Sequence, residues 1–350
     1  MQRITKKLSK SSSYGLLLLG IFWVGTLLIV MKMQNIFTFQ HDDSTVKTLA
    51  ITQKTITSKE PITPLPVIID IDTSKVALGF KLFNDKQLSA DNTISCASCH
   101  DLSRGGVDNL PLSFGINHEQ GSRNAPTVLN SGFNYRQFWD GRVATLEEQI
   151  DGPFLNPKEM ATSWETIIKT LSASPDYRSL FNEIYGKKDI TPVEVRDAIA
   201  TFERALITPN SRFDLWLNGH ETALSSPQKN GYKLFKSYGC VSCHHGINIG
   251  GAMFEKIGVF NDFYGKHPSD DKGRYEITHE EDALYEFKVP SLRNVALTKP
   301  YMHDGSVETL HDAIDLMAYH QLGIILSEAE ISDIEAFLNS LTGDKPSILK

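Results

Sequence analysis

Two short stretches, ISCASCHDLS at Ile94–Ser103 and YGCVSCHHGI at Tyr238–Ile247, carry the strongest information about the fold of this chain. Each contains the pattern Cys-x-x-Cys-His, and all four cysteines of the 350 residues fall in these two motifs. Thiols at this spacing occur in redox dithiols, in zinc half-sites and in attachment sites for c-type haem.

The histidine after the second cysteine distinguishes these alternatives. Only the haem site requires it there, because the two sulfurs bond the porphyrin and the adjacent imidazole ligates the iron. We therefore predict two covalently bound haem c groups rather than two surface disulfides. The predicted attachment residues and proximal ligands are Cys96, Cys99 and His100 in the first motif and Cys240, Cys243 and His244 in the second.

The N-terminal region predicts a membrane anchor. The uncharged run at Tyr14–Met31 has 18 residues, and a helix of that length spans roughly 27 Å, close to the hydrocarbon thickness of a bilayer. The run is longer than the usual core of a signal peptide, and no small-x-small cleavage site follows it. We therefore favour an uncleaved anchor over a cleaved signal peptide. Lys6, Lys7 and Lys10 precede the run, which predicts a cytoplasmic N-terminus and, in a Gram-negative cell, a periplasmic remainder.

Internal repetition predicts two domains after the anchor. GFKLF at Gly79–Phe83 precedes the first haem motif, and GYKLF at Gly231–Phe235 precedes the second. Farther along the chain, Ala125–Ile150 aligns without gaps on Val289–Ile314. Each half then ends in a predicted helix with apolar residues at helical spacing. These closing helices begin with capping boxes, formed by Thr191 with Glu194 and by Ser327 with Glu330.

The predicted fold class is therefore mostly α, with two tandem cytochrome c domains and an N-terminal transmembrane helix. Almost no sheet is expected. The predicted boundaries are 1–34 for the cytoplasmic tip and anchor, 35–70 for a periplasmic linker, 71–224 for the first cytochrome c domain and 225–350 for the second.

The sixth ligand of each iron decides between an electron carrier and an enzyme. Met317, three residues after the second repeat ends, is the predicted ligand of the second iron, with Met302 as the alternative. A thioether favours ferrous iron, so a haem held by His244 and Met317 should have a high potential. The first half instead has a longer loop that presents Glu159 beside Met160. Either Glu159 replaces the thioether, or Met160 is an ordinary ligand and the chain only carries electrons.

The chain resembles the bacterial dihaem cytochrome c peroxidases over about Thr73–Gly343. The motifs that carry the resemblance occur in the family's order and spacing: LSRGGVDNLPLSFG, RNAPTVLNSGFNYRQFWDGR, LEEQIDGPFLNPKEM, FKVPSLRNVALTKPYMHDGSVETL and MAYHQLG. The resemblance implies a low-potential peroxidatic haem in 71–224 and a high-potential electron-transferring haem in 225–350. It also implies that hydrogen peroxide is reduced to water.

The same resemblance implies roles for residues near the first haem. The family's glutamate falls on Glu159 and its glutamine on Gln149, as catalytic residues. A carboxylate over an open iron can move a proton during O–O cleavage, and an amide can orient the peroxide. The tryptophan between the haems falls on Trp139, as an electron relay, although a core aromatic is the alternative. The family's displaceable histidine falls on Ile116, so we expect the nearby His118 to ligate the first iron.

The resemblance further implies a calcium ion between the two domains. Its ligands would be the side-chain amide of Asn124 and the main-chain carbonyl oxygens of Thr298 and Pro300. Hard oxygen ligands of this kind suit calcium. The alternative is that Asn124 only caps a turn.

The predicted partners are hydrogen peroxide and an electron donor, which is a small cytochrome c, a cupredoxin or a quinol. The predicted location is the inner membrane, with one membrane pass, and a homodimer is also compatible with the sequence. A formal net charge of −7 argues against nucleic acid. Two competing functions are a tethered dihaem electron carrier without peroxidase activity and a dihaem oxidase of a protein substrate. The relative that oxidises a protein uses tyrosine where this chain has Met317.

Overall fold

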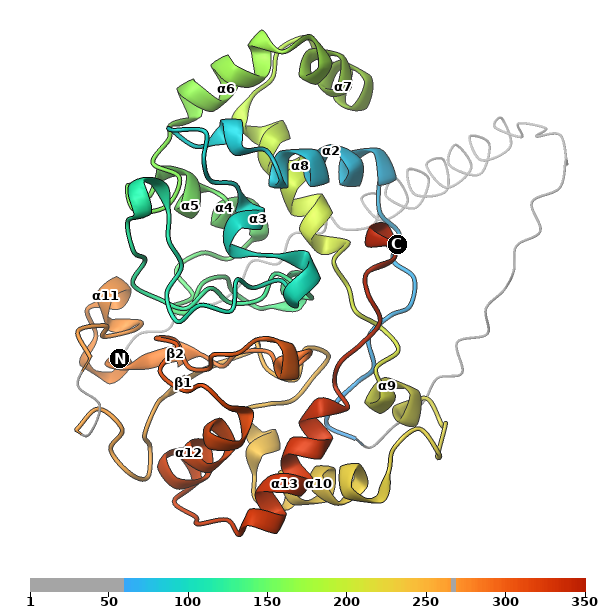
Figure 1. Cartoon of the computed structure of the whole chain (residues 1–350), viewed down its shortest axis with the longest axis vertical. Helices are drawn as coiled ribbons and strands as arrows, with labels where there is room; N and C mark the ends of the chain where they lie inside the picture. The colour runs from blue at the N-terminus through green and yellow to red at the C-terminus, as the bar shows by residue number, and fades with distance from the viewer. Residues whose placement is uncertain (1–59, 266–268) are drawn as a thin grey trace, which may run out of the picture. The chain divides into compact units, whose positions relative to one another are not determined.

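The computed structural model describes residues 60–265 and 269–350 (Figure 1). The predicted anchor at 1–34 and most of the predicted linker at 35–70 lie outside these residues. Within the described ranges, no helix combines the length and the apolar character needed to cross a membrane. The membrane anchor and the inner-membrane location stay predictions.

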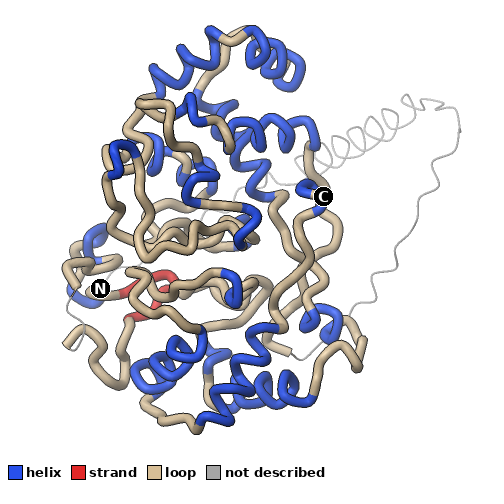
Figure 2. The backbone as a smooth tube through the Cα atoms, viewed as in Figure 1, coloured by secondary structure: helices blue, strands red, loops and turns tan. Residues whose placement is uncertain are grey.

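Helices and loops make up most of the described chain, as the sequence predicts (Figure 2). The α-helices are α2 (Thr73–Phe83), α3 (Cys96–Cys99), α4 (Leu146–Gln149), α5 (Asp151–Leu155), α6 (Trp164–Ala173), α7 (Pro175–Tyr185), α8 (Pro192–Arg204), α9 (Arg212–Leu217), α10 (Ser226–Ser237), α11 (Tyr275–Thr278), α12 (Leu310–Leu322) and α13 (Glu328–Asn339). Short 3₁₀ helices include η3 (Ile116–His118) and η7 (Val295–Leu297). Two short strands, β1 (Phe254–Lys256) and β2 (Glu286–Lys288), pair antiparallel with Phe254 opposite Lys288.

The predicted capping boxes begin both closing helices. The Thr191 side chain accepts a hydrogen bond at the start of α8, and Glu194 reaches back to the Thr191 amide. Ser327 and Glu330 form the same reciprocal pair at the start of α13. Each pair satisfies amide groups that have no partner within the helix.

Two equivalent helix crossings organise the described chain. α2 packs on α8, and α10 packs on α13 (Figure 1). A Cβ atom on Gly79 would lie 2.0 Å from the carbonyl oxygen of Ala198, and one on Gly231 would lie 1.8 Å from that of Asp333. Only glycine permits so close a backbone approach. The glycines of GFKLF and GYKLF therefore have the same structural purpose in the two halves.

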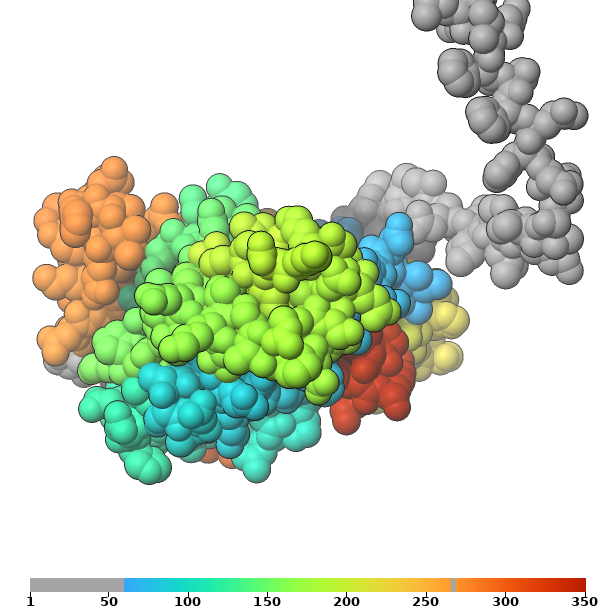
Figure 3. Space-filling model, turned by 90° about the horizontal axis from the view of Figure 1, so that it is seen from above, coloured from blue at the N-terminus to red at the C-terminus, as the bar shows by residue number. Residues whose placement is uncertain are grey.

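Separate groups of apolar side chains pack around these crossings. The first core includes Leu82, Phe154 and Ile199, whereas the second core includes Phe213 and Phe337. The helices α6, α7 and α8 cover the first core, and they form the yellow-green surface in Figure 3. All described residues belong to one compact unit. The predicted domain boundaries at 70/71 and 224/225 stay predictions.

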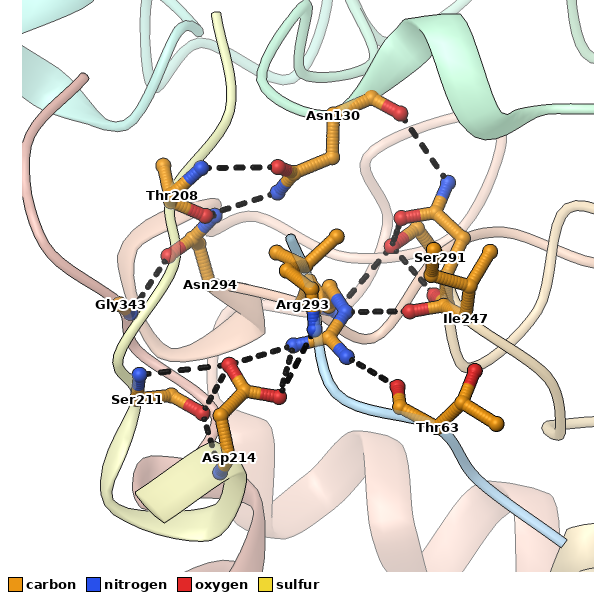
Figure 4. Close-up of polar contacts among 12 residues, drawn as sticks. Thr63, Asn130, Thr208, Ser211, Asp214, Ile247, Ser291, Arg293, Asn294 and Gly343 are labelled. Atoms are coloured by element: carbon orange, nitrogen blue, oxygen red, sulfur yellow. Dashed lines mark hydrogen bonds and ion pairs between the residues drawn. The ribbon is translucent and has the colours of Figure 1, made fainter. Parts of the chain in front are cut away.

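A buried polar contact joins the two copies of the repeat (Figure 4). Asn130 and Asn294, which are equivalent in the repeat, both donate a side-chain hydrogen bond to the Thr208 hydroxyl, at 2.8 and 2.9 Å. Both asparagines have left-handed backbone conformations, with φ of 61° and 59°. Asparagine tolerates this region better than most residues. The identity of these two positions therefore reflects a shared backbone shape and a shared partner.

A buried ion pair lies next to this contact. The guanidinium of Arg293 donates to both carboxylate oxygens of Asp214 at 3.0 Å, and both side chains are almost wholly excluded from solvent. Arg293 also donates to the carbonyl oxygens of Ile247 and Thr63, at 2.5 and 2.9 Å (Figure 4). A buried charge needs this degree of hydrogen bonding to offset its loss of hydration. The pair ties the N-terminal segment to the second core.

Candidate functional site

The two proximal histidines are held by main-chain carbonyl oxygens. His100 Nδ1 lies 3.3 Å from the Gly106 oxygen, and His244 Nδ1 lies 3.4 Å from the Ile249 oxygen. A proton on Nδ1 leaves the Nε2 lone pair for a metal, and this second contact fixes the ring orientation. Burial lowers the pKa of both imidazoles, that of His244 to about 4. Both rings are therefore neutral at pH 7, as iron ligation requires.

The four cysteines accompany these histidines as free, partly buried thiols. Cys96 and Cys99 begin and end α3, so one helical turn sets the distance between them. Burial raises the pKa of both thiols. The thiols and the neutral imidazole of each motif match the donor set of a c-type haem.

A cavity of about 270 Å³ lies beside the second motif. Its wall includes both cysteines of that motif, His244 and the two candidate methionines. Met317 lies on α12, whereas Met302 lies in a loop with a left-handed φ of 72°. The structure brings both methionines to the same cavity, so the choice of Met317 stays a prediction.

Glu159 lies beside the first motif, in the loop after α5. Its carboxylate is close enough to raise the pKa of Cys96 and Cys99. The Asn156 side-chain amide donates to Glu159 Oε1 at 2.7 Å. Burial raises the pKa of this carboxyl above its ordinary value, while the Asn156 hydrogen bond and the charge of Arg142 act in the opposite direction. The loop therefore holds an acid of raised pKa next to the predicted haem attachment.

Met160, the neighbouring residue, has a different environment. Its side chain is 2% exposed and belongs to the first core, where it packs with Leu82 and Phe154. Its main chain also accepts a hydrogen bond from the Ala90 amide at 2.9 Å. The burial of its side chain is that of an ordinary apolar core residue.

His118 and Gln149 occupy less enclosed positions. The His118 side chain is exposed at the end of η3, with a left-handed φ of 60°. The Ile116 amide donates to the Glu159 carbonyl oxygen at 2.9 Å, so the loop that carries His118 is bonded to the loop that carries Glu159. Gln149 ends α4 and is half-buried. The ligand role of His118 and the substrate role of Gln149 stay predictions.

Trp139 lines the cavity beside the second motif. Its indole Nε1 donates to the Asn124 carbonyl oxygen at 2.9 Å, and its own carbonyl oxygen accepts from the Lys288 amide at 2.7 Å. The ring packs edge-to-face on His303, its partner in the repeat, with centroids 6.4 Å apart. The adjacent Asp140 is paired with Arg142 at 2.8 Å. These bonds fix the position of the indole.

The predicted calcium ligands share this cavity wall. Asn124, Thr298 and Pro300 all line it. The Asn124 amide nitrogen donates to the Leu110 carbonyl oxygen at 2.9 Å, which directs its Oδ1 away from that contact. Among residues 60–265 and 269–350, no cluster of three or more His, Cys, Asp or Glu side chains could hold a metal. A calcium site here would thus depend on neutral oxygens.

Three residues that the sequence did not single out contribute to the site. Asn156 holds the Glu159 carboxylate, and its place in the Asn-Pro-x-Glu-Met motif is the signal that indicates it. His303 is fully buried against Phe287, and its ring nitrogens have no hydrogen-bond partner among the described residues. Lys288 is buried in the cavity wall. The sequence carries no signal for the burial of Lys288 or His303.

A mostly helical chain with two such cysteine and histidine sites has the architecture of a dihaem c-type cytochrome. Residues 73–222 match the family described as di-haem cytochrome c peroxidase. The chain is 50% identical over 286 residues to cytochrome c peroxidase Ccp of Escherichia coli K12, and the alignment covers 81% of this chain and 61% of that protein. It is 45% identical over 289 residues to cytochrome c551 peroxidase of Nitrosomonas europaea, and that alignment covers 83% of this chain and 86% of that protein.

A solved structure also resembles the described fold. It is a MauG-like protein associated with microbial copper homeostasis, with a TM-score of 0.73 and 30% identity over 85% of this chain and 97% of that one. The chain thus belongs to the dihaem cytochrome c peroxidases, oxidoreductases that act on peroxide and contain two c-type haems. It spans 61% of the length of the Escherichia coli relative.

Proposed function

We propose that the protein reduces hydrogen peroxide to water at the first haem site, with electrons relayed from the second. Hydrogen peroxide takes up two electrons and two protons to give two water molecules. The observation that carries this proposal is Glu159, a carboxyl group of raised pKa beside the first haem motif. A purely electron-carrying domain has no use for a half-buried carboxyl group that can accept and return a proton at this position.

The residues proposed to hold the haems are the two cysteine pairs, with His100 and His244 as proximal ligands and Met317 as the second ligand in the second half. When bound, the haems supply the electrons and the iron on which peroxide is reduced. The neutral imidazoles and the shared cavity with Met317 support these assignments.

Glu159 is proposed to move the proton from one peroxide oxygen to the other. Its raised pKa matches this task, because an acid–base group works best when its pKa lies near the operating pH. The Asn156 amide orients the carboxylate through the 2.7 Å hydrogen bond. Gln149 is proposed to orient the peroxide through its amide.

Trp139 is proposed to relay electrons between the two halves. It lines the cavity beside the second motif, and hydrogen bonds to Asn124 and Lys288 restrain it. His118 is proposed to close the first site until its loop moves. The bond between Ile116 and Glu159 supports a linked movement of the two loops.

Calcium, held by Asn124, Thr298 and Pro300, is proposed to set the packing around Trp139. Chelation should therefore lower turnover, and added calcium should restore it. The proposed location is the periplasmic side of the inner membrane, and the proposed donor is a small cytochrome c, a cupredoxin or a quinol. The names of the relatives support a cytochrome donor.

The test is steady-state peroxide consumption by the purified, calcium-loaded protein with one haem reduced. Each donor class is supplied in turn, and the oxidised donor is measured along with the peroxide lost. We expect two electrons from the donor for each peroxide. Reversible reduction of both haems without peroxide consumption under every condition would instead establish an electron carrier.

A further inference from the structure

Lys288, the last residue of β2, has a largely buried side chain in the wall of the cavity beside the second motif. Its side chain is 8% exposed. Within the described part of the chain, no carboxylate or hydrogen-bond acceptor is paired with its Nζ. Burial alone lowers the pKa of this amine to about 8, and no acidic neighbour opposes that effect. An anion bound in the cavity that Lys288 lines would stabilise this ammonium, because a largely desolvated charge without a partner is unfavourable.

Glu255 lines the same cavity and Glu286 precedes Lys288 by two residues on β2, but neither carboxylate pairs with Lys288. The strand register places Glu255 opposite Phe287, whereas Lys288 lies opposite Phe254. Glu255 instead acts on Cys243, whose pKa it helps to raise. Glu286 pairs with Arg274 at 3.5 Å. A group bound in the cavity can therefore supply the partner of Lys288.

The cavity wall also contains the second cysteine pair and His244. A haem attached there would carry two propionate carboxylates, and these are the anions that it would bring into the cavity. We propose that Lys288 binds a propionate of the second haem and thereby raises that haem's reduction potential. This proposal rests on the haem assignment of the proposed function, but it does not require peroxide turnover.

The main chain of Lys288 links this ion pair to the relay. Its amide donates to the Trp139 carbonyl oxygen at 2.7 Å, so the residue that holds the propionate also fixes the backbone of the indole. Lys288 thus positions both the cofactor and the relay from one end of a short strand. Only the side-chain contact should affect the charge balance of the haem.

The physical effect follows from charge. Reduction removes one positive charge from the iron centre, and a nearby cation therefore stabilises the reduced state. Loss of a poorly hydrated cation close to the haem should lower the equilibrium constant for one-electron reduction about tenfold, a shift of about 59 mV.

The test compares three variants of the holoprotein by spectroelectrochemical titration of both haems. Lys288→Met should lower the potential of the second haem and leave that of the first unchanged, and Lys288→Arg should restore it. Lys256→Met is the matched control, because Lys256 lines the same cavity but is exposed, so solvent screens its charge. An unchanged second-haem potential in Lys288→Met, or an equal drop in Lys256→Met, would overturn the proposal.

A crystal structure of the wild-type holoprotein gives an independent answer if Lys288→Met fails to fold. It should place Nζ about 2.7–2.9 Å from a propionate oxygen, the range of a charge-assisted hydrogen bond. An Nζ directed to solvent or to a protein carboxylate would contradict the proposal. A protein that shows the potential shift but consumes no peroxide would retain this inference and refute only the peroxidase function.

Discussion

The indole Nε1 of Trp139 donates a hydrogen bond to the main-chain carbonyl oxygen of Asn124, 2.9 Å away. The main-chain amide of Asn124 in turn donates a hydrogen bond to the His303 carbonyl oxygen at 2.8 Å, and this bond joins the two copies of the repeat. Asn124 is thus bonded to the proposed relay while its side chain belongs to the proposed calcium site. A change in calcium occupancy would therefore alter the position of the Trp139 indole through Asn124.

Replacing Trp139 with phenylalanine should slow electron transfer between the haems. The substitution keeps an aromatic ring but removes the N–H, which leaves the Asn124 carbonyl oxygen without its donor and costs about 1–3 kcal/mol of unfolding free energy. Flash or stopped-flow reduction of the second haem would measure the transfer rate. Trp164→Phe is the matched control, because its Nε1 also donates a hydrogen bond, to Asp151 at 3.0 Å, but it packs against the first core. Equal transfer rates in the two variants would exclude the relay.

The pH dependence of turnover should report the Glu159 carboxyl group. Burial raises its pKa, so the ionised form appears at higher pH than for a free glutamate, and activity should rise as pH increases through that pKa. The Asn156 hydrogen bond lowers the same pKa. Asn156→Ala should therefore move the acidic limb of the kcat/KM profile to higher pH. Lys158→Ala, an exposed neighbour, should leave the limb in place.

A limb that moves to lower pH in Asn156→Ala, or moves equally in both variants, would contradict this assignment. A uniform loss of activity with an unmoved limb would mean that Asn156 supports only the loop. The profile must be measured at saturating donor, so that donor binding does not contribute its own pH dependence.

The buried pair of Arg293 and Asp214 should dominate the stability of the second core. Asp214→Asn leaves the guanidinium without its counter-charge, and breaking a buried pair in this way costs about 3–5 kcal/mol of unfolding free energy. Glu308→Gln is the control, because its pair with Lys299 is well exposed and should be worth about 0–1 kcal/mol. Denaturant unfolding measures both. Similar losses in the two variants would show that burial of the ion pair does not matter.

The parts of the fold that repeat in the sequence were the parts that could be predicted. Gly79 and Gly231 occupy matching pentapeptides, and both lie where a helix crosses its partner with no room for a Cβ atom. The capping boxes at Thr191 and Ser327 also have local causes, and the structure confirms both. Local spacing and the repeat thus indicated the helical framework.

The environment of the site residues could not be predicted in the same way. The bond from Ile116 to Glu159 and the burial of Lys288 both arise between segments that are distant along the chain. A lysine in a strand of three residues is expected to be exposed, and only the packing around the cavity reverses this. The sequence therefore indicated which residue types carry the chemistry, but not the partners that tune them.

Glu159 carries the central claim, that this chain is a peroxidase and not only an electron carrier. The most direct measurement is steady-state peroxide turnover by Glu159→Gln, with Glu165→Gln as an exposed control on α6. The amide keeps the size of the side chain but removes the acid–base group, so turnover should fall by about 10²- to 10⁴-fold while both haems attach and reduce normally. The control should retain wild-type turnover. Wild-type turnover in Glu159→Gln, with both haems loaded, would contradict the account.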